Sequence, residues 1–206
     1  MIPEYYLFDE IGIGDCRAEP LGRFLAANPG EVTLRINSPG GIATDGAAMV
    51  AAIEQHGNVA VQVSGIAASA ASLVMVAGRR VSLHRDSMVM IHDPAALAFG
   101  TGDQLRKWAD TLDKIAGVYA ATYARHTGNP VDLIAGWMAA ETWMTAEEAK
   151  ALRFCDAIEG DEAAAPVAAF DYGKFRNAPA HLVQMARKNG WAAGTPVTGK
   201  KETQHA

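Results

Sequence analysis

Hydrophobic and polar positions alternate over residues 32–36 and 59–63, which is the pattern of half-buried β-strands. Residues 5–11, 81–83 and 88–91 are three further short segments that are interpreted as strands. Between them, residues 44–56 and 67–77 carry apolar side chains at helical spacing. Strands that alternate with helices favour right-handed crossovers in a mostly parallel sheet. The pattern therefore predicts an α/β fold.

The longest periodic segment covers residues 103–123. One face of the predicted helix is mainly apolar and carries Leu105, Trp108, Ala109, Leu112, Ile115, Ala116, Tyr119 and Tyr123. The opposite face is charged, so this is an amphipathic helix that needs a partner for its apolar side. A shorter helix is predicted up to about residue 139. Thr145 and Glu148 form a capping-box pattern that opens another, and residues 156–158 can close the sheet.

The composition changes after residue 159, where periodicity weakens and Pro, Gly and Ala accumulate. We expect one catalytic-size domain over residues 1–160 and a C-terminal tail over 161–206. The tail is interpreted as a linker, a weak helix near 181–187 and a disordered end, with a partly docked extension as the alternative.

Composition and charge exclude several classes of protein. The 206 residues are 50% hydrophobic and 20% charged, a mixture typical of a globular domain and not of a disordered chain or fibre. The net charge of −5 disfavours nucleic acid as a partner. No apolar run approaches the roughly 18 residues that span a membrane, and residues 1–10 are not a signal peptide. Two distant cysteines, Cys16 and Cys155, indicate neither a disulfide framework nor a zinc site, so a cytoplasmic location is expected.

Ser69 lies among very small residues where a strand gives way to a helix, in the sequence G-I-A-A-S-A-A-S. Such a turn can present a hydroxyl at the edge of the sheet, and the N–H groups of the following helix can face a developing oxyanion. The equally weighted alternative is a small-residue helix in which serine only fills space. The G-x-S-x-G motif of α/β-hydrolases is absent.

Three further segments could contribute to chemistry, although each has a more ordinary interpretation when taken alone. Residues 37–41 (N-S-P-G-G) end in paired glycines that let the backbone approach a ligand, or they form an ordinary turn. His92 follows an apolar strand and could be a base or a satisfied edge residue. Glu141 precedes a capped helix and could be functional or a surface carboxylate. No histidine pair has a metal-binding spacing, and we expect no metal and no organic cofactor.

Together these segments resemble the Clp-type serine peptidases, in particular the phage-encoded head maturation branch. The resemblance extends over about residues 5–160 and rests on five strings in the family's order: I-N-S-P-G-G, G-I-A-A-S-A, M-I-H-D-P, H-T-G and T-A-E-E-A. It implies a ClpP/crotonase-like fold of repeated β-β-α units with a protruding handle helix.

The same resemblance implies the role of each site residue. Ser69 would be the nucleophile and His92 the general base, with the backbone N–H groups of Gly41 and Ala70 as the oxyanion hole. Glu141 occupies the position of the third member, where the family usually has aspartate.

The activity implied is that of a serine endopeptidase acting on unfolded proteins or peptides as a homo-oligomeric ring, either a heptamer or a double ring. A ring ATPase is an implied partner, although a first strand beginning near residue 5 leaves little room for the N-terminal segment that docks it. For a phage enzyme, the capsid or scaffold proteins of the prohead would be the partners. The alternatives are a Ser–Lys peptidase using Lys107 or Lys114, a crotonase-type acyl-CoA enzyme and a catalytically silent scaffold.

Overall fold

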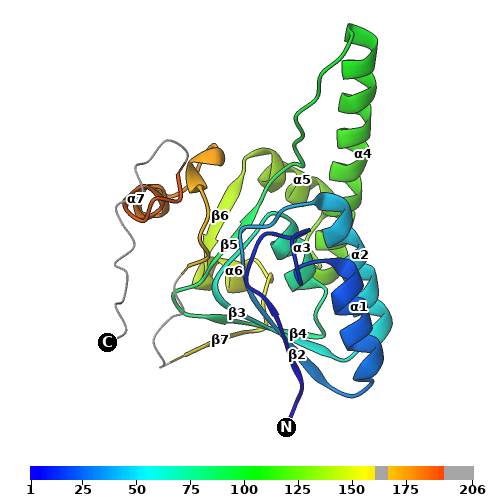
Figure 1. Cartoon of the computed structure of the whole chain (residues 1–206), viewed down its shortest axis with the longest axis vertical. Helices are drawn as coiled ribbons and strands as arrows, with labels where there is room; N and C mark the ends of the chain where they lie inside the picture. The colour runs from blue at the N-terminus through cyan, green and yellow to red at the C-terminus, as the bar shows by residue number, and fades with distance from the viewer. Residues whose placement is uncertain (161–166, 193–206) are drawn as a thin grey trace, which may run out of the picture. The chain divides into compact units, whose positions relative to one another are not determined.

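A computed structural model describes residues 1–160 and 167–192 of the chain. The chain divides into two compact units, Met1–Ala168 and Ala169–Ala206. The first unit contains the sheet and all the candidate site residues (Figure 1). Residues 161–166 and 193–206, which fall in the expected linker and the expected disordered end of the tail, lie outside the described residues.

A seven-stranded sheet forms the centre of the first unit. The strands are β1 (Glu4–Leu7), β2 (Val32–Ser38), β3 (Val59–Ala68), β4 (Arg80–His84), β5 (Met88–Ile91), β6 (Thr142–Thr145) and β7 (Ala157–Glu159). The main path runs β1-β2-β3-β4-β7 with every pair parallel, while β5 pairs in parallel with the end of β3 and antiparallel with β6. The predicted α/β fold with a mostly parallel sheet is therefore confirmed.

The alternation of the sequence translates into two different faces of the sheet. Val59, Val61 and Val63 of β3 are buried in the hydrophobic core, whereas Gln62 and Ser64 point to the other side and are half-buried. Burial of one side of each strand fixes its register, because a slip of one residue would expose the valines.

Several boundaries differ from the predicted ones. The first strand ends at Leu7, and Ile11 instead forms an isolated bridge with Gly41. β3 continues to Ala68, so the predicted helix from residue 67 begins only at Ala70. The stretch before the capping box forms β6, which the sequence pattern did not predict.

The described residues of the first unit form six helices. They are α1 (Ala18–Ala27), α2 (Ala43–His56), α3 (Ala70–Val76), α4 (Gly102–Thr127), α5 (Val131–Ala139) and α6 (Ala146–Ala151). The sequence analysis missed α1, which carries Pro20 and Gly22 and has no side-chain cap of its own at Arg17. Its first amide, that of Ala18, instead donates to the Asp45 carboxylate of α2 at 2.8 Å, a contact that local sequence cannot reveal.

The long helix α4 has two parts with different surroundings. Residues 102–111 are exposed on every side, and the helix extends well beyond the sheet (Figure 1). Leu105 and Trp108 accordingly remain 42% and 49% exposed. Tyr119, Ala120 and Tyr123 in the second part are buried against the core of the same unit. The predicted apolar face is thus continuous, but among the described residues only its second half is covered.

The second unit, in its described part, contains a short 3₁₀ helix, η1 (Tyr172–Lys174), and α7 (Ala180–Lys188). The weak helix expected near 181–187 corresponds to α7. No helix in the described residues combines the length and the apolar character needed to cross a membrane.

The capping box at α6 allows a direct test of local stability. Thr145 accepts the amide of Glu148 at 3.2 Å, and the Glu148 carboxylate accepts the amide of Thr145 at 2.8 Å. We predict that Thr145→Ala lowers the free energy of unfolding by about 1 kcal/mol in urea titrations, because the amide of Glu148, in a helix packed on the core, loses its side-chain acceptor.

Thr101→Ala is the matched control, because Thr101 forms the same capping box at the exposed start of α4. Loss of this cap should only fray the first turns of α4, which touch no core residue. The global free energy of unfolding should therefore stay nearly unchanged. An equal destabilisation by the two variants would contradict this account.

Candidate active site

Ser69 occupies a strained turn between a strand and a helix. β3 ends at Ala68 and α3 begins at Ala70, so the reversal of chain direction is concentrated at Ser69. Its φ of 54° and ψ of −128° belong to a region that disfavours every residue except glycine. Holding a non-glycine residue there costs roughly 1–3 kcal/mol, and such residues cluster at active sites.

The turn places the Ser69 hydroxyl against an imidazole. The Oγ atom lies 2.7 Å from Nε2 of His92, a hydrogen-bond distance. His92 directly follows β5, and β5 is fixed beside the end of β3 by the pairing of Ala68 with Met90. The Ser69 amide also donates to the Met90 carbonyl at 2.9 Å. The two side chains therefore meet because their strands are hydrogen-bonded neighbours.

Ser72, the other hydroxyl in the small-residue segment, has different surroundings. It is fully buried, and its Oγ lies 2.7 Å from the Ser69 carbonyl and 2.8 Å from the Met90 carbonyl. The structure thus distinguishes two serines that the sequence places three residues apart: Ser69 contacts the histidine, and Ser72 is bonded to the backbone of the turn.

The glycine pair of the 37–41 segment lies next to this turn. A Cβ atom added to Gly40 would lie 2.6 Å from Cβ of Ser69 and 2.9 Å from the amide nitrogen of Ala70. The Gly40 carbonyl accepts the amide of Ile11 at 2.7 Å. Because a trans peptide directs its C=O and N–H in opposite directions, the Gly41 N–H points away from Ile11. The sequence analysis singled out Gly41, but did not identify the close approach of Gly40.

Glu141 reaches the same region through the antiparallel pairing of β5 with β6. Ile91 is paired with Thr142, so His92 directly follows and Glu141 directly precedes the last pair of this ladder. The amide of Asp93, the residue after His92, also donates to the Met138 carbonyl at the end of α5, at 3.2 Å.

The carboxylate of Glu141 is held in an unusual environment. Glu141 is only 8% exposed and has a φ of 52°. The indole Nε1 of Trp143 donates to its Oε1 atom at 3.2 Å. In the described part of the chain, the non-glycine residues with a positive φ are Ser69, Glu141 and Arg153. Two of these three residues are candidate site residues.

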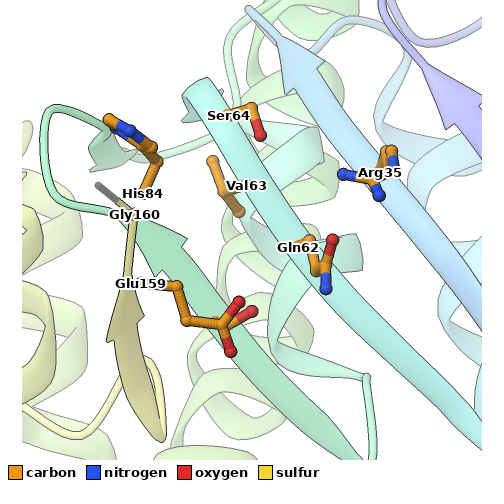
Figure 2. Close-up of a pocket in the computed structure, with 8 residues that line it drawn as sticks. Arg35, Gln62, Val63, Ser64, His84, Glu159 and Gly160 are labelled. Atoms are coloured by element: carbon orange, nitrogen blue, oxygen red, sulfur yellow. The ribbon is translucent and has the colours of Figure 1, made fainter. Parts of the chain in front are cut away.

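A separate polar hollow of about 470 Å³ lies over the strands away from Ser69. Figure 2 shows the side chains that line it, which include Arg35 of β2, Gln62 and Ser64 of β3 and Glu159 of β7. The guanidinium of Arg35 donates twice to the Glu4 carboxylate and holds the pKa of Glu4 below its usual range. The cation of this hollow is thus already paired, and the hollow is not part of the Ser69 site.

Within the described residues, no group of three or more histidine, cysteine or acidic side chains could hold a metal ion. The two cysteines, Cys16 and Cys155, are both buried and unpaired with each other. Burial raises the pKa of the Cys155 thiol to about 11, so this thiol stays protonated near neutral pH. Ser69 is therefore the better candidate for a nucleophile.

Comparison with known proteins connects this geometry to one family. Residues 24–162 match the family model described as Clp protease. An ATP-dependent Clp protease proteolytic subunit 2 from Thermobifida fusca (strain YX) is 32% identical over 131 residues, which is 62% of this chain and 64% of that protein. An ATP-dependent Clp protease proteolytic subunit from Pleurastrum terricola is 32% identical over 136 residues, or 64% of this chain and 69% of that protein. The chain thus spans about two thirds of the length of these curated relatives.

The contact between Gly40 and the Ser69 turn can be tested by measuring stability. Gly40 has a φ of +93°, and a Cβ atom there would lie 2.5 Å from the Ala68 carbonyl oxygen. We predict that Gly40→Ala lowers the free energy of unfolding by at least about 2 kcal/mol, because both the backbone and its neighbours must shift.

Gly22→Ala is the control with the opposite expected sign. Gly22 lies within α1, and nothing approaches within 4 Å of the position its Cβ would take. Alanine there should stabilise the protein by roughly 0.5–1 kcal/mol. A Gly40→Ala variant as stable as the wild type in denaturant titrations would show that the turn does not need this close approach.

Proposed function

Because the chain belongs to the Clp protease family, we propose that it is a serine endopeptidase whose nucleophile is Ser69. The single observation that carries the proposal is the 2.7 Å contact between Ser69 Oγ and His92 Nε2. A serine hydroxyl is a weak nucleophile, and it needs a base at hydrogen-bond distance to accept its proton during attack.

The proposed reaction proceeds through an acyl-enzyme. Nε2 of His92 takes the Ser69 proton while Oγ bonds to the carbonyl carbon of the substrate peptide. The resulting imidazolium donates that proton to the leaving amine as the C–N bond breaks, which leaves an ester on Ser69. Water, deprotonated by the same imidazole, then attacks the ester, and the proton returns to Ser69 as the acid product leaves. No metal or organic cofactor takes part in these steps.

The N–H groups of Gly41 and Ala70 are proposed to stabilise the oxyanion. The Gly41 N–H is directed away from Ile11, and Ala70 is the first residue of α3, where amides have no acceptor within the helix. Ala70 follows Ser69 along the chain, and Gly41 follows Gly40, which closely approaches the Ser69 turn. Two such donors lower the energy of the tetrahedral intermediate more than that of the substrate.

Glu141 is proposed to orient His92 and to stabilise the imidazolium that forms during attack. Its support is the pairing of Ile91 with Thr142, the two residues next to His92 and Glu141, together with the burial of Glu141. Glutamate is one methylene longer than the family's usual aspartate, and the hydrogen bond from the Trp143 indole restricts where its carboxylate can lie.

The geometry favours histidine over lysine as the base. Lys107 and Lys114 of the alternative Ser–Lys mechanism are both exposed on α4, whereas His92 contacts Ser69. A crotonase-type acyl-CoA enzyme would use the paired N–H groups but has no need of a serine–histidine contact. The peptidase therefore explains more of the site.

The proposed substrates are unfolded proteins or peptides, and the proposed assembly is a homo-oligomeric ring, heptameric or double. The names of both relatives describe a proteolytic subunit of an ATP-dependent protease, which supports a multisubunit assembly and a ring ATPase partner for this chain. The uncovered first half of α4, with Leu105 and Trp108 exposed, offers a surface for another subunit. Light scattering that finds an active monomer would contradict the ring.

Head maturation in a phage is the narrower hypothesis, and it rests on the sequence resemblance alone. It predicts that capsid or scaffold proteins are trimmed during head assembly. Assembling heads in which these proteins remain intact would rule it out.

The role of Ser69 is tested by substitution. Ser69→Ala should lower the turnover of internally quenched peptides by about 10⁶-fold, because the covalent intermediate can no longer form. Ser64→Ala is the matched control, since Ser64 of β3 lines the hollow of Figure 2, whose lining residues include neither Ser69 nor His92. Turnover in Ser69→Ala equal to that of Ser64→Ala would refute the proposed function.

The role of Glu141 is tested by removing its charge while keeping its shape. Glu141→Gln should lower turnover by about 10³–10⁴-fold, because the imidazolium loses its counter-charge and the correct tautomer is no longer favoured. Glu141→Asp should recover much of this loss. Near-native turnover of Glu141→Gln at every pH tested would show that another group orients His92.

A further inference from the structure

The Ser69 carbonyl lies at the centre of a buried hydrogen-bond network. Ser72 Oγ lies 2.7 Å from this carbonyl oxygen, and the amide of Ser72 donates to it at 3.0 Å. Ser72 Oγ also lies 2.8 Å from the carbonyl of Met90, which accepts the amide of Ser69. Ser72 thus bridges the turn that holds the nucleophile and the strand that leads to His92.

Tyr123 of α4 completes the network from a distant part of the sequence. Its hydroxyl lies 2.8 Å from Ser72 Oγ and 3.5 Å from the Ser69 carbonyl oxygen. Tyr123 is 1% exposed and Ser72 is 0% exposed, so water does not compete for these hydroxyls. The tyrosine ring packs against Phe154, with 5.8 Å between ring centroids, which keeps the phenol in place.

The hydroxyl protons of Ser72 and Tyr123 determine which group donates and which accepts in each hydrogen bond of the network. Ser72 has one proton for two backbone carbonyls at almost equal distance, so its lone pairs remain available to a donor. Tyr123 supplies that donor, because its hydroxyl lies closer to Ser72 Oγ than to any carbonyl of the turn. Burial raises the pKa of Tyr123 far above that of a free phenol, so it remains a neutral donor wherever the protein is folded.

We propose that Ser72 and Tyr123 are positioning residues for the reaction at Ser69, an inference that rests on the proposed peptidase function. The Ser69 turn is strained, and without its carbonyl anchors the backbone would relax toward a negative φ. That relaxation would swing Oγ away from Nε2 of His92, and a displacement of even about 1 Å can slow a reaction step by about 10²-fold. Neither residue touches the substrate, and both act through the backbone of Ser69.

Tyr123→Phe is the sharpest variant, because it removes one oxygen atom and keeps the ring against Phe154. We expect kcat for internally quenched peptides to fall by about tenfold, the effect of one positioning hydrogen bond, while KM stays within about twofold. The pH profile of kcat should keep its shape, because the base is unchanged. A folding defect alone would lower the active fraction and the melting temperature without changing kcat per active site.

Ser72→Ala should cause a similar or larger loss in kcat. Because Tyr123 acts through Ser72, the double variant should lose no more than Ser72→Ala alone, so the two effects do not multiply. Multiplicative losses would overturn the proposed connection between the two hydroxyls.

Thr122→Val is the matched control. Thr122 precedes Tyr123 on the same helix and is buried, but its hydroxyl donates to the Val118 carbonyl of its own helix at 3.0 Å. Its kcat should equal that of the wild type even if its melting temperature falls. A Tyr123→Phe enzyme with unchanged kcat per active site, titrated with a serine-reactive probe, would overturn the inference while leaving the proposed function intact. A wild type no faster than Ser69→Ala would overturn both.

Discussion

The hydrogen bond from the Ser69 amide to the Met90 carbonyl is the constraint on which the site depends. It joins the end of β3, where the chain reverses through a strained residue, to β5, which delivers His92 two residues later. Because the bond is part of the pairing between the two strands, the contact between Ser69 and His92 is set by the backbone. The small residues around Ser69 allow this close approach of strand, helix and glycine loop.

β3 can make this connection because it changes partner along its length. Its first half pairs with β4 and its last residues pair with β5. At the break, Gly65 has a φ of 116°, and its amide donates to the hydroxyl of Ser87 at 3.1 Å. The same hydroxyl donates to the Val63 carbonyl at 3.0 Å, so a buried serine satisfies the backbone groups where the pairing is interrupted. A strained turn thus follows a strand whose interruption is bridged by the Ser87 hydroxyl.

Much of the fold could be predicted from the sequence, because the alternating valines of β3 and the helical spacing in α4 are local signals. A contact between Ser69 and His92 could be expected because each residue follows a predicted strand and because the motifs occur in the family's order. α1 was missed because its first amide is capped by Asp45 of α2, and β6 because four residues beside a capping box carry little periodicity.

Contacts between distant segments account for the features of the site that the sequence did not reveal. Tyr123 has the signature of one more apolar position on a long helix, and only the fold shows that its hydroxyl reaches Ser72. The close approach of Gly40 to Ser69 likewise depends on the pairing of Ser38 with Ala67 across β2 and β3. No local pattern reports such contacts, because they join residues about thirty to fifty positions apart.

The central claim of the proposal is that His92, held against Ser69 by the strained turn, activates Ser69 as a nucleophile. The most direct measurement is tandem mass spectrometry of the intact assembly after reaction with a fluorophosphonate, with fragmentation fine enough to separate Ser69 from Ser72. The account predicts a single covalent adduct on Ser69 and none on Ser72. An unlabelled folded protein, or an adduct on any other serine, would contradict it.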